Sequence, residues 1–362
     1  MQVAVVHDYL TQRGGAERVV LAMLRALGDV PLFTSLYAPE ATFPEFERVD
    51  VRTSPLNRVS FLRRSHRLAL PLLAPAFSRL AVDADVAVCS SSGWAHGARV
   101  SGKKIVYCHA PARWLYQRER YAAPASLARV ALAVLGPPLE RWDRAAAAGA
   151  TRYLANSRAV AREVREIYGI DAEVLPPPPG LTAEGERDPL AGLAPGFVLC
   201  VTRPQRYKNV GAVLDAFRLL PDQRLVVAGD GPDAARLRGS APSNATFLGR
   251  VTDAELRSLY DGCAGTVSAA YEDFGLVPVE AASFGRPTAA LAFGGFLDTV
   301  EDGSNGVLFE RPEPEPIAEA VSRLTGRDWD EAGLRRSAAR FAEPAFAARL
   351  REVVAEISGG TR

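Results

Sequence analysis

The stretch "LPPPPG", residues 175–180, lies near the middle of a chain of 362 residues. Proline has no backbone N–H and fixes its own φ angle, so four in a row fit neither a helix nor the interior of a sheet and form a stiff, extended connector. A single hydrophobic core seldom grows large enough to serve a chain of this length. The stretch therefore predicts two domains, at residues 1–178 and 179–343.

Short apolar runs alternate with longer helical patterns on both sides of the connector. The predicted strands are residues 3–7, 32–36, 86–90, 104–109, 153–156 and 173–175 before it, and 197–202, 225–229, 246–249, 265–269, 287–291 and 306–309 after it. This alternation is typical of parallel sheets, which bind ligands outside the carboxyl ends of their strands. We predict an α/β fold of two doubly wound, Rossmann-like domains that face each other across a cleft. Residues 344–362 are expected to add a helix that returns to the N-terminal domain.

The composition is that of an ordinary globular protein. Apolar residues make up 48% of the chain and the formal net charge is +1, so no nucleic-acid partner is expected. Four well-separated cysteines (Cys89, Cys108, Cys200 and Cys263) give neither zinc-type spacing nor a disulfide framework. The N-terminus lacks the features of a signal peptide, and no segment approaches the ~18 apolar residues that a membrane span needs. These features predict a cytoplasmic protein.

Two glycines follow the first predicted strand. Gly14 and Gly15 stand between that strand and a helical pattern that includes Val19 and Val20. Glycine lets a backbone approach a ligand closely, and the N–H groups at a helix start attract anions, so a phosphate is the natural ligand. A flexible turn without a ligand explains the pair about equally well.

Two cations follow the first strand after the connector. Arg203 and Lys208 lie between the end of that strand and the next helical pattern. Arginine offers a bidentate fork and lysine a point charge, so together they could clamp a pyrophosphate. Simple solvation is the alternative because surface arginines are numerous here, but the position at a strand end favours a binding role.

A glycine pattern follows the next strand. Gly229, Gly231 and Ala234 fit the G-x-G-x-x-A fingerprint of dinucleotide-binding domains. The fingerprint needs an acidic residue at the end of the following strand, where this chain has Gly249 and Arg250 instead. A hydride-transfer enzyme is therefore disfavoured. We expect the glycines to line a nucleotide pocket, whose base-binding part would be backbone around Arg250 and Val251.

The stretch "YEDFGLVPVE", residues 271–280, places two carboxylates eight residues apart. Glu272 precedes a predicted helix, Glu280 lies about one turn inside it, and the N–H groups of Phe274, Gly275 and Leu276 are at its start. A loop carboxylate and open N–H groups can hold sugar hydroxyls, and the second carboxylate suits a ribose diol. Taken alone, electrostatic capping of the helix by Glu272 is the better explanation.

One histidine stands at the end of a predicted strand. His109 closes the run at residues 104–109, and the Pro111 that follows forces the chain out of the sheet. A lone histidine more often has a structural hydrogen bond than a catalytic role. Its place at a strand mouth raises the expectation that it contacts a ligand.

Taken in order, these features resemble the retaining, nucleotide-sugar-dependent glycosyltransferases of family 4, which have the GT-B fold. The features are "GGAER" after the first strand, His109, Arg203 with Lys208, residues 229–232, and Glu272 with Glu280. The resemblance covers nearly the whole chain. The stretches "HDYLTQRGGAER" and "YCHAPARWLY" look most like GDP-mannose-using mannosyltransferases of bacterial polysaccharide assembly. UDP-sugars stay open as donors.

The resemblance implies a role for each residue. Arg203 and Lys208 would offset the charge of the departing diphosphate, and Gly14 and Gly15 would touch the same phosphates. Glu272 and the amides of residues 274–276 would hold the donor sugar, with His109 near its anomeric carbon and Glu280 on the ribose. The leaving phosphate can accept the acceptor's proton, so no enzymic base is implied. No metal cofactor is expected, because Arg and Lys replace the divalent ion.

Residues 51–82 have a basic and apolar composition. They carry no acidic residue, and their arginines are Arg52, Arg58, Arg63, Arg64, Arg67 and Arg79. Large apolar side chains such as Phe61 and Phe77 lie between them, which suits contact with an anionic membrane through residues 52–79. An ordinary basic helix pair on the acceptor side is about as good an explanation. Family members often use a glycan or lipid-linked acceptor, which fits the membrane interpretation.

Three alternatives remain at this point. A GT-B epimerase would share the fold and the phosphate clamp but would need no acceptor. A two-domain solute-binding protein would belong to another class, and such proteins are normally exported. An NAD-dependent oxidoreductase is disfavoured by the missing ribose acid.

Overall fold

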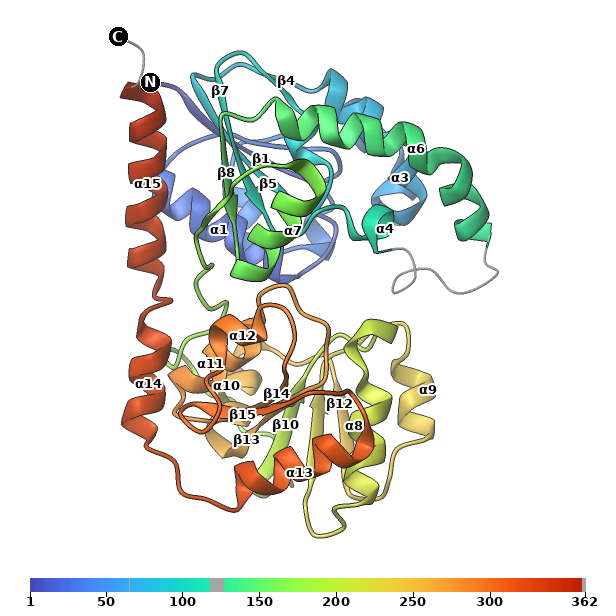
Figure 1. Ribbon diagram of the computed structural model, residues 1–362, viewed down its shortest axis with the longest axis vertical. Helices are drawn as coiled ribbons and strands as arrows, with labels where there is room; N and C mark the ends of the chain where they lie inside the picture. Colours follow the sequence, from blue (N-terminus) through green and yellow to red (C-terminus); the bar gives the residue numbers. More distant parts are fainter. Residues whose placement is uncertain (65, 118–126, 360–362) are drawn as a thin grey trace. The chain divides into compact units, whose positions relative to one another are not determined.

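The computed structural model describes residues 1–64, 66–117 and 127–359, and the chain divides into two compact units. One unit is Met1–Pro178 together with Glu343–Arg362, and the other is Pro179–Ala342. Figure 1 shows the chain coloured from its N-terminus in blue to its C-terminus in red. Each unit is built around its own parallel sheet.

The first unit has a seven-stranded sheet in the order β3-β2-β1-β5-β7-β8-β9. Its strands are β1 Val3–His7, β2 Leu32–Thr34, β3 Val51–Thr53, β5 Val86–Ser91, β7 Lys103–Cys108, β8 Arg152–Ala155 and β9 Glu173–Val174, and a small second sheet pairs β4 Ala81–Val82 with β6 Arg99–Val100. Its helices are α1 Gly15–Leu27, α2 Ser60–Arg64, α3 His66–Arg79, α4 Arg113–Tyr116, α6 Leu127–Ala148, α7 Arg158–Tyr168 and α15 Glu343–Gly359. Short 3-10 turns lie at Pro39–Ala41, Pro44–Arg48, Pro55–Arg58 and Ala95–Gly97.

The central strands of this sheet are buried on both faces, which explains their near-continuous apolar runs. Ala87 and Cys89 of β5 pack with α3 and α7 on one face, while Val86 and Val88 pack with α1 and α15 on the other. Figure 1 shows α15 beside α1, although nearly the whole chain separates them in sequence. The C-terminal helix is therefore part of the first unit's core.

The second unit has a six-stranded parallel sheet in the order β12-β11-β10-β13-β14-β15. Its strands are β10 Phe197–Val201, β11 Leu225–Ala228, β12 Ala245–Gly249, β13 Cys263–Ser268, β14 Thr288–Leu291 and β15 Gly306–Phe309. Its helices are α8 Val210–Arg218, α9 Ala234–Gly239, α10 Asp253–Gly262, α11 Leu276–Ser283, α12 Phe296–Thr299, α13 Pro314–Thr325 and α14 Glu331–Ala339, with a 3-10 turn at Arg206–Lys208. This strand order reverses between β10 and β13, which is the position where such sheets bind their ligands.

The predicted α/β fold of two Rossmann-like domains is confirmed. Each predicted run contains a strand, with ends that differ by a few residues, so that His109 lies just beyond β7 instead of ending it. The pattern did not predict β3, β4 and β6. These strands are two or three residues long, and β3 lies at the edge of its sheet with Arg52 and Thr53 exposed, so it has no apolar run to detect.

The four cysteines are free and buried. Over residues 1–64, 66–117 and 127–359, no helix is long and apolar enough to cross a membrane.

Candidate functional site

The loops after β10 and β11 approach each other so closely that two positions require glycine. A Cβ on Gly229, whose φ is +126°, would lie 1.9 Å from the Thr202 carbonyl oxygen. A Cβ on Gly231 would lie 2.5 Å from the Pro204 oxygen and 3.2 Å from Cγ of Arg203. These contacts place the stem of Arg203, whose side chain is exposed, against the glycine loop at the carboxyl edge of the sheet.

An ion pair joins the loops after β10 and β13, on the two sides of the point where the strand order reverses. Lys208 Nζ donates to Glu272 Oε1, and the two side chains are 14% and 25% exposed. Asn209, which has a left-handed backbone with φ 51°, donates from Nδ2 to the Ala269 carbonyl at 2.8 Å. The backbone N–H of Tyr271 also donates to the Tyr207 carbonyl at 3.0 Å. Several contacts therefore hold Lys208 and Glu272 together.

The loop that carries Glu272 packs against the segment "FGGF", residues 293–296. The Gly295 N–H donates to the Glu272 carbonyl at 3.0 Å, and Phe293 lies edge-on to Tyr271 with ring centroids 4.9 Å apart. A Cβ on Gly294 would lie 2.0 Å from the Glu272 oxygen, and one on Gly295 would lie 2.2 Å from Cα of Phe274. Side chains at these two positions would push the glutamate loop away.

Helix α11 begins at Leu276, after Gly275 in a left-handed conformation with φ 83°. A Cβ on Gly275 would lie 2.5 Å from the Phe296 ring, so this position also needs glycine. Phe274 is 5% exposed and packs with Phe341. Gly275 is the N-cap, so the N–H groups of Gly275 and Leu276 belong to the helix start and that of Phe274 precedes it.

Glu280 lies on α11 and is 8% exposed. Its Oε2 accepts a hydrogen bond from the Tyr260 hydroxyl at 2.9 Å, and its Oε1 accepts one from the Gly180 backbone N–H at 3.2 Å. Gly180 ends the proline connector. Glu280 therefore holds the start of the second unit as well as standing near its sheet edge.

Arg250 and Val251 follow β12, next to the glycine loop. The Gly249 carbonyl accepts a hydrogen bond from the Gly229 N–H at 2.7 Å, Arg250 is exposed, and Val251 packs partly buried against the core. A Thr252–Glu255 capping box then starts α10. The two residues line the same edge as Gly229.

In the first unit, Gly14 caps the start of α1, and Gly15 is the first residue of that helix. A Cβ on Gly14 would lie 2.6 Å from Glu17 Oε2. The Glu17 side chain is 2% exposed, and its Oε1 lies 3.9 Å from His7 Nε2 and accepts a hydrogen bond from Gln12 Nε2 at 3.1 Å. A side chain at position 14 would therefore press against the buried Glu17 carboxylate.

His109 is 9% exposed and joins a buried line of polar side chains. Its Nε2 lies 2.8 Å from Ser90 Oγ, which lies 3.0 Å from His7 Nδ1. Burial, with the charges of His7 and Arg113, lowers the pKa of His109 to about 3. Burial would also lower the pKa of His7, but the Glu17 and Asp8 carboxylates and the Ser90 carbonyl outweigh it and raise that pKa above its ordinary value.

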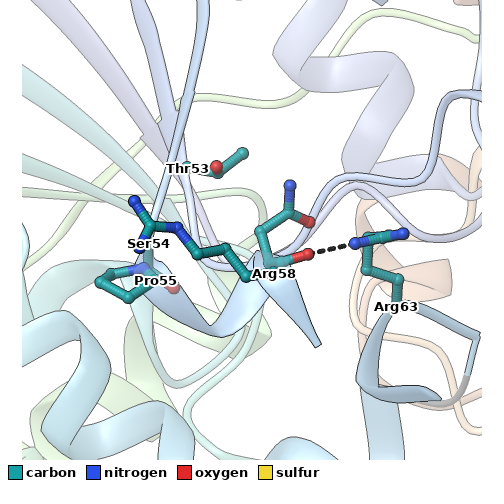
Figure 2. A pocket seen from close by; sticks show the side chains of 6 residues that line it. Thr53, Ser54, Pro55, Arg58 and Arg63 are labelled. Carbon is teal, nitrogen blue, oxygen red and sulfur yellow. Dashed lines mark hydrogen bonds between the residues drawn. The ribbon is translucent and has the colours of Figure 1, made fainter. Parts of the chain in front are cut away.

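The basic segment forms β3, α2, α3 and β4 of the first unit. A hollow of about 370 Å³ beside β3 is lined by Thr53, Ser54, Pro55, Asn57, Arg58 and Arg63. Figure 2 shows these side chains and the hydrogen bond that Arg63 donates to the Asn57 carbonyl. Arg52 pairs with Asp50 at 2.7 Å and is not among the residues that line this hollow. Residue 65 and the side chains of Arg67 and Leu68 lie outside the described part.

Comparison with known proteins decides the family. The model of "Glycosyltransferase Family 4" matches residues 13–178, and the model of "Glycosyl transferases group 1" matches residues 186–340. The chain belongs to the family 4, group 1 glycosyltransferases. The two matches meet near the proline connector.

Curated relatives of this glycosyltransferase match over part of their length. A glycogen synthase of Thermus thermophilus is 36% identical over 176 residues, which is 46% of this chain and 40% of that protein. A D-inositol 3-phosphate glycosyltransferase of Mycobacterium bovis is 31% identical over 246 residues, which is 58% of this chain and 51% of that protein. The chain therefore spans only about half the length of these relatives, or less.

Solved structures share the fold of this glycosyltransferase over nearly its whole length. The sucrose-phosphate synthase of Thermosynechococcus elongatus has a TM-score of 0.73 at 19% identity and covers 99% of both chains. Anabaena Alr3699/HepE, solved in complex with UDP-glucose, has a TM-score of 0.70 at 18% identity, over 98% of this chain and 100% of its own. At these identities the likeness shows the fold.

Sequence reasoning missed several residues that shape the site of this glycosyltransferase. Gly294 and Gly295 support the Glu272 loop, and the GG pair between two phenylalanines was a detectable turn signal. Tyr260, His7 and Ser90 gave no such signal, because their partners are far away in sequence.

Proposed function

We propose that the protein is a retaining glycosyltransferase that moves a hexose from a nucleotide diphosphate sugar to a glycan or lipid-linked acceptor. The observation that carries the proposal is the Lys208–Glu272 pair, which joins the two loops where the second sheet reverses its strand order. A cation and a sugar-binding carboxylate are the groups that an activated sugar needs at one place. Donor binding would let Lys208 exchange its carboxylate partner for a phosphate.

The remaining roles in the second unit follow from position. Arg203 would share the diphosphate with Lys208, and the glycines at 229 and 231 would let the backbone approach it. Glu280 would bind the ribose diol, because the two oxygens of a carboxylate can accept hydrogen bonds from neighbouring hydroxyls. Arg250 and Val251 would border the base. In the first unit, Gly14 and Gly15 would contact phosphate. His109 would contact the donor sugar.

The clamp is tested by a pair of arginine variants in one loop. Arg203→Ala should raise the Kd for a nucleoside diphosphate roughly tenfold or more, because a charge-assisted hydrogen bond contributes about 1.5–3 kcal/mol. Arg206→Ala, an equal charge change at an exposed site three residues away, is the control and should leave the Kd nearly unchanged. Equal affinities for the two variants, measured by calorimetry, would remove Arg203 from the clamp.

For the donor, we propose GDP-mannose, on the resemblance of "HDYLTQRGGAER" and "YCHAPARWLY" to GDP-mannose-using enzymes. A UDP-sugar is the alternative, and it is favoured by the UDP and UDP-glucose complexes of Anabaena Alr3699/HepE. A thermal-shift panel of GDP, UDP, ADP and their sugars separates the two, because a ligand that binds only the folded state raises its Tm. The largest shift is expected for GDP species, and a larger one for UDP species would reverse the assignment.

Transfer, isomerisation and hydrolysis are separated by an incubation with donor alone. A transferase should give at most slow hydrolysis without an acceptor, whereas an epimerase should convert the donor to its isomer.

Added EDTA should leave turnover unchanged, since Arg203 and Lys208 would take the place of a divalent ion. With an acceptor, NMR of the product should show the donor's anomeric configuration, and the inverted configuration would exclude a retaining reaction.

We further propose that the basic segment meets an anionic membrane that carries the acceptor, which places the enzyme at the inner face of that membrane. Val59, Phe61, Leu72 and Leu135 are 37%, 57%, 45% and 40% exposed, and an apolar hollow of about 490 Å³ lies between α3 and α6. Arginines beside exposed apolar side chains favour headgroup contact. The protein should sediment with vesicles rich in phosphatidylglycerol at low salt. A Phe61→Ser variant should bind them more weakly, and absence of binding by the natural protein would exclude the contact.

A further inference from the structure

Four buried side chains of the first unit form a line that ends at His109. They are Glu17 on α1, His7 at the end of β1, Ser90 on β5, and His109 after β7, and each is at most 9% exposed. The successive distances are 3.9 Å from Glu17 Oε1 to His7 Nε2, 3.0 Å from His7 Nδ1 to Ser90 Oγ, and 2.8 Å from Ser90 Oγ to His109 Nε2. The line crosses three neighbouring strands of one sheet.

The Ser90 carbonyl fixes the direction of these hydrogen bonds. His7 Nδ1 lies 3.2 Å from that carbonyl oxygen, which can only accept, so Nδ1 carries a proton and shares it between the carbonyl and the Ser90 hydroxyl. The hydroxyl has one proton of its own. Among the hydrogen bonds of the described residues, its oxygen has two partners, His7 Nδ1 and His109 Nε2. His7 Nδ1 is itself a donor, so the acceptor left for the hydroxyl proton is His109 Nε2.

The charges at the far end of the line raise the pKa of His7 and so favour its form with a proton on both nitrogens. Its Nε2 faces Glu17, and Asp8 lies next to it in the chain with its carboxylate held by the N–H groups of Ser92 and Ala95 at 2.7 and 2.6 Å. A cationic His7 then opposes a second positive charge on His109, as does Arg113. The aromatic Tyr107 packs edge-on against His109 and excludes water from that side.

We propose that Glu17, His7 and Ser90 are positioning residues that hold His109 neutral with its ring proton on Nδ1, so that the imidazole presents an N–H donor and no charge. The low pKa of His109 and the raised pKa of His7 agree with this assignment. The inference rests on the proposed function only for what Nδ1–H contacts, which would be a hydroxyl of the donor sugar. A neutral donor suits that place, because positive charge develops on the sugar as the diphosphate departs and an imidazolium would oppose it.

The direct test reads the tautomer of His109 in the natural protein. The chain has four histidines, at positions 7, 66, 96 and 109, so two-bond ¹H–¹⁵N spectra of ¹⁵N-histidine-labelled protein are assignable with single His→Gln variants. His109 should show a protonated Nδ1 and an unprotonated Nε2 from pH 8 to pH 5, and His7 should be protonated on both nitrogens at pH 7. A protonated Nε2 on His109, or titration of His109 near pH 6.5, would overturn the inference.

Variants test whether the line sets that state. Ser90→Ala should leave His109 in a mixture of tautomers and lower kcat about tenfold with a nearly unchanged donor KM, which corresponds to one lost hydrogen bond of roughly 1.4 kcal/mol. Ser90→Thr keeps the hydroxyl and should restore both. Ser91→Ala is the matched control, because Ser91 is equally buried on the same strand but bonds to His96. An unchanged His109 spectrum in Ser90→Ala would refute the role of Ser90.

The His109 tautomer and the proposed sugar transfer can be refuted separately. A fixed Nδ1–H tautomer without any sugar transfer would refute the proposed function but not the tautomer. Sugar transfer with the opposite tautomer would refute only the assignment of the tautomer.

Discussion

At the residue scale, Lys208 and Glu272 form an ion pair in which each charge offsets the other. Both are partly exposed, so the pair contributes little to stability and its main effect is to keep two reactive groups at one edge of the sheet. The Lys208 ammonium also lies 5.0 Å from the centre of the Tyr207 ring, which limits where it can move. The ion pair and the ring contact together restrict the position of the Lys208 ammonium.

The first prediction concerns Glu272. Glu272→Gln keeps the shape of the side chain but removes the charge, so turnover should fall by about two orders of magnitude if the carboxylate binds the sugar mainly in the transition state. Nucleoside diphosphate affinity should stay the same or rise, because Lys208 loses its competing partner. Asp273→Asn, the same chemical change one residue later, is the control. Full turnover of Glu272→Gln would contradict the assigned role.

The second prediction concerns pH. The pKa of His109 is about 3 in the folded protein and about 6.5 in an unfolded chain, so the unfolded state binds the extra proton and stability falls as pH drops below 6.5. Between pH 6.5 and 5 this loss is about 2 kcal/mol, and His109→Gln should abolish it. His7→Gln should change this slope little, since the stability from the raised pKa of His7 is nearly all present below about pH 6.5 and is lost only as the pH rises above it. Urea melts at both pH values measure these slopes, and parallel slopes in all three proteins would contradict the shifts.

At the scale of the elements, the sequence predicted what depends on local pattern. The buried strands β5 and β10 were evident as apolar runs, and the loops after β10 and β13 were placed correctly because parallel strands end at one edge. The edge strand β3 was missed, because a half-exposed strand does not have the consecutive apolar residues by which buried strands were recognised. The Glu17–His7–Ser90 line could not be predicted, since sheet register, which brings His7 opposite Ser90, is set by the whole domain.

The third prediction separates backbone strain from displacement of an element. Gly294 and Gly303 both have positive φ, at +59° and +77°, but only Gly294 would bring a Cβ against the Glu272 carbonyl, at 2.0 Å. Alanine at either position should cost about 1 kcal/mol of stability through strain. Gly294→Ala should also lose turnover, because the Glu272 loop must move. Thermal melts measure the stability of both variants and rate assays their turnover. Normal turnover of both variants would contradict this account.

At the scale of the whole molecule, the first unit is completed by the end of the chain. Helix α15 buries Phe346, Leu350 and Val353 against β5, β7 and α1, and Lys103 Nζ donates to the Ile357 carbonyl at 2.8 Å. Arg349 forms a hydrogen bond with Glu173 of β9 at 2.7 Å. The second unit is continuous in sequence, whereas the first needs both termini. Damage to α15 should therefore weaken the first unit and spare nucleotide binding by the second.

The last prediction uses this difference. Leu350 is fully buried, so Leu350→Ala should destabilise the first unit by about 2–5 kcal/mol through lost burial and the cavity that remains. Leu72→Ala, at a site of the same unit that is 45% exposed, is the control and should change stability little. In calorimetry the variant should lower one transition, while added GDP should still raise the other, because the proposed nucleotide-binding residues other than Gly14 and Gly15 lie in Pro179–Ala342. A single transition that moves as a whole with both the substitution and the nucleotide would mean that the two units unfold together and that α15 stabilises the nucleotide site as much as its own sheet.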